Sequence, residues 1–116
     1  MNLNEYPAAI AKLQTQLTGF DLAVEKTQAT LKQIESEIDT CVAFDSGLRN
    51  DAQRKAKRQE LLEEHLHYWE QQEILSQTKA KREQIFIELC LRRNEFSILK
   101  LERREAIASL ELQANQ

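Results

Sequence analysis

Glu64, His65 and His67 form the pattern in this sequence that comes closest to a metal-binding motif. Glu64 and His67 are three residues apart, the spacing by which ferritin-like helical bundles place a carboxylate and an imidazole on one face. Glu35 and Glu37 could complete such a site, but they flank the apolar positions of their own helix and do not occupy them. We therefore expect a solvated helix face here, with no metal and no cofactor.

Two cysteines, Cys41 and Cys90, are the candidate nucleophiles. Both fall on apolar stripes, which predicts that both are core residues. In a helical hairpin folded at Ser46–Gly47, His65 and His67 would be remote from both cysteines. The sequence also has no Gly-rich phosphate loop and no H-E-x-x-H motif. Slender helices also offer little concave surface for a substrate. The sequence predicts that the chain is not an enzyme and has no small-molecule substrate.

A basic cluster at 49–58 sets five positive charges against one acidic residue, Asp51. Its members are Arg49, Arg54, Lys55, Lys57 and Arg58. Such a cluster can contact phosphates, so a small nucleic-acid-associated helical protein using Arg54, Lys55, Lys57 and Arg58 is an alternative function. The whole chain, with 19 acidic and 16 basic residues and a net charge of −3, has no general attraction to nucleic acid.

The composition determines which elements could hold these residues. Two glycines and one proline in 116 residues are too few for a β sandwich or a nucleotide-binding α/β fold. We therefore expect one all-α domain covering 1–116. Met1–Ile10 lacks the features of a signal peptide, and no stretch is long and apolar enough to span a membrane. These features predict a cytoplasmic protein that does not act at a membrane.

The first expected helix covers about 5–43. Apolar residues recur along it at alternating steps of three and four, with Thr27 as the exception. The stripe consists of Leu3, Tyr6, Ile10, Leu13, Leu17, Phe20, Val24, Thr27, Leu31, Ile34, Ile38 and Cys41. A repeat of 3.5 residues sustained over five heptads is typical of a left-handed coiled coil.

The segment 44–50 interrupts this pattern with a glycine and several turn-forming residues. Asn50 followed by Gln53 resembles a capping box, which predicts that a second helix begins there. No Gly or Pro follows, so we expect one long helix over about 51–114. The resulting fold is an antiparallel coiled-coil hairpin with a short first helix and a long second helix. A tip at Ser46–Gly47 would place Tyr6 opposite Ile87.

The end of the second helix is its most apolar part and, in this register, has no partner within the chain beyond Cys90. Two apolar runs alternate along this segment of the helix. One run contains Ile85, Leu89, Phe96, Leu99, Ala106 and Leu110, and the other contains Ile87, Leu91, Ile98, Leu101, Ala108 and Leu112. A helix with two apolar faces is covered on two sides. We expect a protein interface formed by Ile85, Leu89, Phe96, Leu99, Leu101, Ile107 and Leu110.

The expected partner is a second copy of the chain, giving a homodimer that forms a helical bundle, or another helical protein. The alternative is a three-helix bundle in one monomer, with a break near Ser76–Thr78 that folds 79–112 back. The sequence thus favours a non-enzymatic scaffold, adaptor or small subunit that docks through an apolar helical surface.

Overall fold

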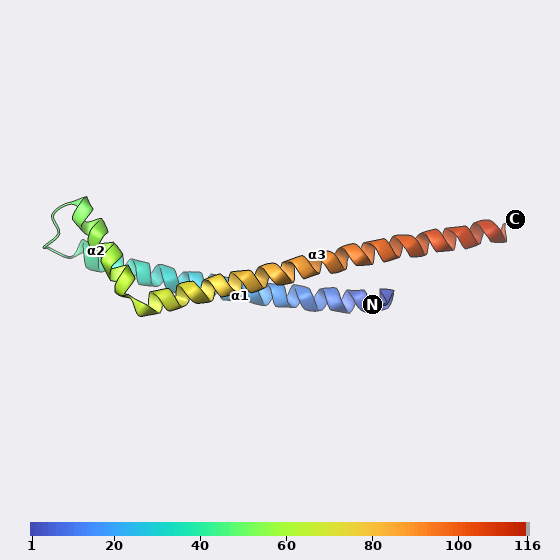
Figure 1. Ribbon diagram of the computed structural model, residues 1–116, viewed down its shortest axis with the longest axis horizontal. Coiled ribbons are helices and arrows are strands. Elements are labelled where there is room, and N and C mark those ends of the chain that lie inside the picture. Colours follow the sequence, from blue (N-terminus) through green and yellow to red (C-terminus); the bar gives the residue numbers. More distant parts are fainter. Residues whose placement is uncertain (116) are drawn as a thin grey trace. The chain divides into compact units, whose positions relative to one another are not determined.

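The computed structural model describes residues 1–115, and every regular element among them is helical. A short 3-10 helix, Leu3–Glu5, leads directly into the first long helix. The α-helices, shown in Figure 1, are α1 (Tyr6–Ala43), α2 (Asp51–Glu64) and α3 (Leu66–Ala114). The all-α class predicted from the composition is confirmed.

The described residues group into two compact units. Unit 1 consists of Met1–Gly19 together with the chain from Arg82 onward, and unit 2 is Phe20–Lys81. Each unit therefore contains a stretch of α1 and a stretch of α3, whereas α2 belongs to unit 2 alone.

The apolar stripe predicted along α1 supplies all the buried side chains of this helix except Val42. In unit 1 the buried side chains are Tyr6 and Leu13, and in unit 2 they are Thr27, Leu31, Ile34, Ile38 and Val42. Thr27 is the polar member, and its hydroxyl donates to the Ala23 carbonyl at 2.9 Å. Because that hydroxyl has a partner, its burial leaves no unsatisfied donor in the core.

The core of unit 2 lies where α1 meets α2. Ile34, Ile38 and Val42 of α1 form a buried cluster with Leu62 of α2. Tyr68, at the start of α3, packs against this cluster and is itself partly buried. Since all three helices contribute to it, this cluster holds α2 against α1.

The start of α2 shows half of the predicted capping box: Asn50 is the N-cap, but the Gln53 side chain bonds the Arg49 amide and not the Asn50 amide. The Asn50 side chain accepts a hydrogen bond from the Gln53 backbone N–H at 2.9 Å. The Gln53 side chain in turn accepts from the Arg49 backbone N–H at 2.7 Å. Two amide groups that would otherwise lack a helical partner are thereby satisfied, which explains why the helix begins at Asp51.

The single helix predicted over 51–114 is wrong at one residue. α2 ends at Glu64, α3 begins at Leu66, and His65 between them has extended backbone angles of φ −85° and ψ 95°. Neither glycine nor proline causes this break. Side-chain hydrogen bonds around His65 stabilise it.

Hydrogen bonds satisfy the backbone on both sides of the break. The His65 imidazole Nδ1 accepts from the Tyr68 backbone N–H at 3.0 Å, so His65 acts as the N-cap of α3. The His65 backbone N–H donates to the Leu62 carbonyl at 3.2 Å. The Trp69 indole N–H donates to the Glu63 carbonyl, also at 3.2 Å, which satisfies a carbonyl in the last turn of α2.

The break required by the three-helix alternative is absent. α3 runs without interruption through Ser76–Thr78, and the Thr78 hydroxyl donates to the Ile74 carbonyl at 2.7 Å, one turn earlier. This bond is made inside a continuing helix and caps no end. Residues 79–112 therefore do not fold back as a separate helix.

Candidate functional site

The first apolar face of α3, here called the inner stripe, consists of Ile85, Leu89, Phe96 and Leu99. Leu89 is only 1% exposed, and the other three are half-buried. Besides α3, unit 1 contains only Met1–Gly19, so this segment provides the cover. Four of the seven predicted interface residues thus lie at a contact within the chain.

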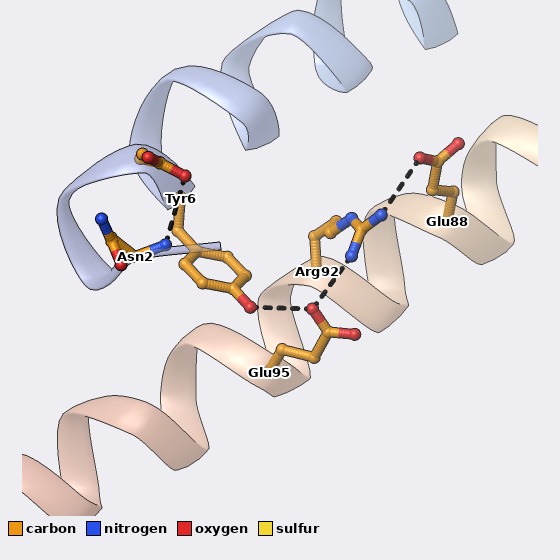
Figure 2. Close-up of polar contacts among 6 residues, drawn as sticks. Asn2, Tyr6, Glu88, Arg92 and Glu95 are labelled. Carbon is orange, nitrogen blue, oxygen red and sulfur yellow. Dashed lines mark hydrogen bonds and ion pairs between the residues drawn. The ribbon is translucent and has the colours of Figure 1, made fainter.

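Tyr6 is the clearest link between the two segments of unit 1. Its ring stacks on that of Phe96, with centroids 5.6 Å apart and an angle of 7° between the planes. Its hydroxyl donates to Glu95 Oε2 at 2.9 Å, as Figure 2 shows. The side chain is 5% exposed. Tyr6 therefore combines apolar burial with a single directed polar contact.

Glu95 is shared between Tyr6 and a neighbouring arginine. Arg92 contacts the same Oε2 atom at 3.1 Å and reaches Glu88 at 3.8 Å (Figure 2). The hydrogen bonds from Tyr6 and Arg92 lower the pKa of the Glu95 carboxyl. The bond to Glu95, assisted by burial, raises the pKa of the Tyr6 hydroxyl. Near neutral pH this leaves a charged carboxylate and a neutral phenol, an arrangement that positions helices and activates no nucleophile.

The predicted register between the helices is wrong. In unit 1, Tyr6 contacts Glu95, which lies eight residues beyond the expected Ile87. In unit 2 the Tyr68 hydroxyl donates to Glu35 at 3.3 Å. Residues in the loop after α1 and at the break at His65 add to the length of the chain but pair with no further residues of α1. Each residue of α1 therefore lies opposite a residue with a higher number than expected. Contact within the chain consequently extends past Cys90, as far as Leu99.

The second apolar face of α3, here called the outer stripe, is exposed along its whole length. It has eight positions at alternating steps of four and three: Ile87, Leu91, Asn94, Ile98, Leu101, Glu105, Ala108 and Leu112. Its five large apolar side chains are 51–68% exposed. Each inner-stripe position is followed two residues later, about 200° around a helix, by an outer-stripe position: Ile87, Leu91, Ile98 or Leu101. This part of the outer stripe therefore lies almost opposite the face that Met1–Gly19 covers.

Three predicted interface residues remain uncovered in unit 1. Leu101 belongs to the outer stripe, while Ile107 and Leu110 lie beyond the last half-buried residue of the inner stripe, Leu99. They are 48–65% exposed. Asn94 and Glu105 were not among the predicted interface residues, because that prediction considered apolar side chains only. Their shared spacing with the apolar positions was the signal that could have found them.

The basic cluster at the start of α2 is largely paired with acidic residues. Arg54 lies 3.0 Å from Asp51, Lys57 lies 3.7 Å from Glu60, and Arg58 lies 2.7 Å from Asp39 of α1. The bond to Asp39 raises the pKa of the Arg58 guanidinium. Lys55 is exposed. Of these acidic residues, only Asp51 lies within 49–58, whereas Glu60 lies just beyond that range and the contact with Asp39 arises from tertiary packing.

The histidines are used locally. His65 Nδ1 caps α3, and His67 Nδ1 lies 3.7 Å from Glu70. A shallow cavity of about 220 Å³ is lined by both imidazoles and by Glu37. Within residues 1–115, no group of three or more His, Cys, Asp or Glu side chains could hold a metal ion.

The expectation that both cysteines are core residues is wrong for Cys41. Cys41 is exposed, and Val42, the next residue, is 7% exposed and takes the core position. The last turn of α1 thus presents a slightly rotated face, because a straight helix repeats at 3.6 residues and moves away from a 3.5-residue stripe. Cys90 is half-buried, and neither thiol is in a disulfide.

Searches of protein-family models, curated proteins and solved structures found no match to this chain. No helix in the described part of the chain is long and apolar enough to cross a membrane. Functional inference therefore depends on the surface features above, of which the outer stripe is the most extensive.

Proposed function

We propose that the chain is a non-enzymatic coiled-coil interaction protein, acting as a scaffold, adaptor or small subunit. The observation that carries this proposal is the exposed outer stripe, whose five large apolar side chains share one face of α3 in unit 1. Burying one such side chain contributes about 1.5–3 kcal/mol, so a helical partner would gain substantially by covering the stripe.

The architecture we propose is an antiparallel helical hairpin whose long arm docks onto a second copy or another helical protein. The heptad spacing of the outer stripe matches the seam of a coiled coil. The two thiols that are not in disulfides support a reducing, cytoplasmic setting.

The test is a pair of double variants measured by light scattering and sedimentation. Leu91→Gln with Leu101→Gln makes two outer-stripe positions polar. Arg93→Gln with Glu111→Gln is the matched control, because both residues are exposed and lie off both stripes. We expect the first pair to weaken association at least about tenfold and the control to leave it unchanged. Equal behaviour of the two pairs would refute docking through this face.

The alternative, nucleic-acid association through Arg54, Lys55, Lys57 and Arg58, has weaker support. Three of these four residues already have acidic neighbours within 4 Å, so fewer charges are available to phosphate. A gel-shift titration at low salt tests this alternative. Binding that weakens with added salt and with Lys55→Gln would favour it.

A further inference from the structure

The pattern of apolar and polar positions along the outer stripe is the same in both directions. Ile87 corresponds to Leu112, Leu91 to Ala108, and Ile98 to Leu101. The two polar positions, Asn94 and Glu105, correspond to each other in the same scheme. The steps of four and three are also symmetric, so a reversed copy of the stripe fits the original layer by layer.

Two copies laid antiparallel along this face therefore form eight layers. Six layers place an apolar side chain opposite an apolar one, and two place Asn94 opposite Glu105 of the second copy. The two-fold axis passes between Leu99 and Lys100. This is the self-complementary contact that a two-fold symmetric dimer requires.

Other arrangements of the same two helices lose this match. A parallel pair in register would oppose Glu105 to Glu105, two like charges. An antiparallel pair shifted by one heptad would oppose Asn94 to Leu112 or Ile98, and Glu105 to Leu101 or Ile87. A buried polar residue without a polar partner is costly, and in coiled coils such a residue selects the register.

We infer that the outer stripe is the site at which two copies of this chain join as an antiparallel homodimer, in which the Asn94 amide donates to the Glu105 carboxylate of the second copy. This inference rests on the proposed function and specifies its partner. All eight positions belong to unit 1, and they face away from the segment that covers the inner stripe. The dimer consequently adds a helix to α3 without displacing Tyr6 from Phe96.

The polar layers provide the first test, by sedimentation equilibrium. Asn94→Asp places a carboxylate opposite Glu105 and is expected to raise the dimer dissociation constant about tenfold or more. Glu105→Gln keeps a hydrogen-bonding pair and should change the constant only a few-fold. Combining Asn94→Asp with Glu105→Lys creates an ion pair and should restore dimerisation. Both positions are exposed in the monomer, so circular dichroism at a dilution where every variant is monomeric should show the same helicity as the wild type.

Cross-linking determines the direction of the helices. In a chain carrying Cys41→Ser and Cys90→Ala, Ile98→Cys and Leu101→Cys are prepared as separate single-cysteine proteins. We expect a disulfide mainly when the two proteins are mixed, because position 98 faces position 101 of the second copy. Disulfides formed mainly within each protein alone would overturn the antiparallel register.

The outcomes separate this inference from the proposed function. The homodimer would be overturned if the chain stays monomeric at high micromolar concentration and if the two single-cysteine proteins form no disulfide, either mixed or alone. This outcome would leave docking onto a different helical protein as the function of the outer stripe. The wild-type chain could also prove to be dimeric while two variant proteins keep its dissociation constant: the Leu91→Gln, Leu101→Gln double variant and Asn94→Asp. That result would refute both proposals.

Discussion

Tyr6 shows how one residue can join two distant segments of a chain. Its ring covers Phe96, and its hydroxyl fixes the position of Glu95, which Arg92 also holds. The ring contact depends on apolar surface and is insensitive to pH. The polar contact requires a protonated phenol and an ionised carboxyl, so its contribution to stability has a limited pH range.

The stability that the Tyr6–Glu95 bond adds to unit 1 should follow two titrations. The lowered pKa of Glu95 means that this stability is present above the unfolded value of about 4.3 and is lost as the pH falls through the lower, folded value. The raised pKa of Tyr6 means that it is present below about 10 and is lost as the pH rises through the higher, folded value.

Thermal unfolding of the wild type and Tyr6→Phe between pH 3 and pH 11 checks this prediction. The difference in Tm should be largest from about pH 5 to about pH 9 and should shrink toward both extremes. A difference close to zero across the whole range would show that only the ring matters.

His65 is the second residue whose role follows from one atom. Its Nδ1 accepts from the Tyr68 N–H, so removal of the imidazole leaves the first turn of α3 without its cap. We expect His65→Ala to lower the free energy of unfolding by about 1 kcal/mol. His65→Asn, which supplies an acceptor oxygen, should retain most of this stability. Urea titrations followed by circular dichroism would measure both, and equal losses would contradict the capping role.

At the scale of the elements, the sequence predicted the helices well where local signals are strong. The 3–4 stripe located α1, and Asn50 with Gln53 located the start of α2. The break at His65 was missed because histidine is a weak capping signal and no Gly or Pro is present. The register was missed because periodicity records which face of a helix is apolar and contains no information about how many residues a loop or break consumes.

Gly19 is the element-scale test of α1. A Cβ added at Gly19 would have no atom within 4 Å, so nothing opposes a side chain there. We expect Gly19→Ala to raise the free energy of unfolding by about 1 kcal/mol, since alanine favours the helix. Gly47→Ala is the control, because its Cβ would lie 3.2 Å from Asp45 Oδ1 in the loop and should give no such gain. Chemical denaturation of both variants would show the difference.

At the scale of the whole molecule, covered and uncovered parts of α3 can be distinguished. Leu89 is almost completely buried, whereas residues 101–112 are exposed throughout. An uncovered helical segment depends on its own weak propensity and opens readily, while one covered by a partner opens rarely.

Amide hydrogen exchange at two protein concentrations checks this expectation. Residues 101–112 should exchange quickly in dilute protein and slow at least about tenfold at a concentration where the dimer forms. Residues around Leu89 should exchange slowly at both concentrations. Uniform protection along α3 in dilute, monomeric protein would contradict it.

Trp69 gives the bend between α2 and α3 an optical signal of its own. It is the single tryptophan of the chain, and its indole N–H is bonded to the Glu63 carbonyl across that bend. Intrinsic fluorescence excited at the red edge of the absorption band therefore reports on this one place. The side chain is already 49% exposed, so straightening of the bend would act on the emission by breaking this hydrogen bond, a change that is readable without any attached dye.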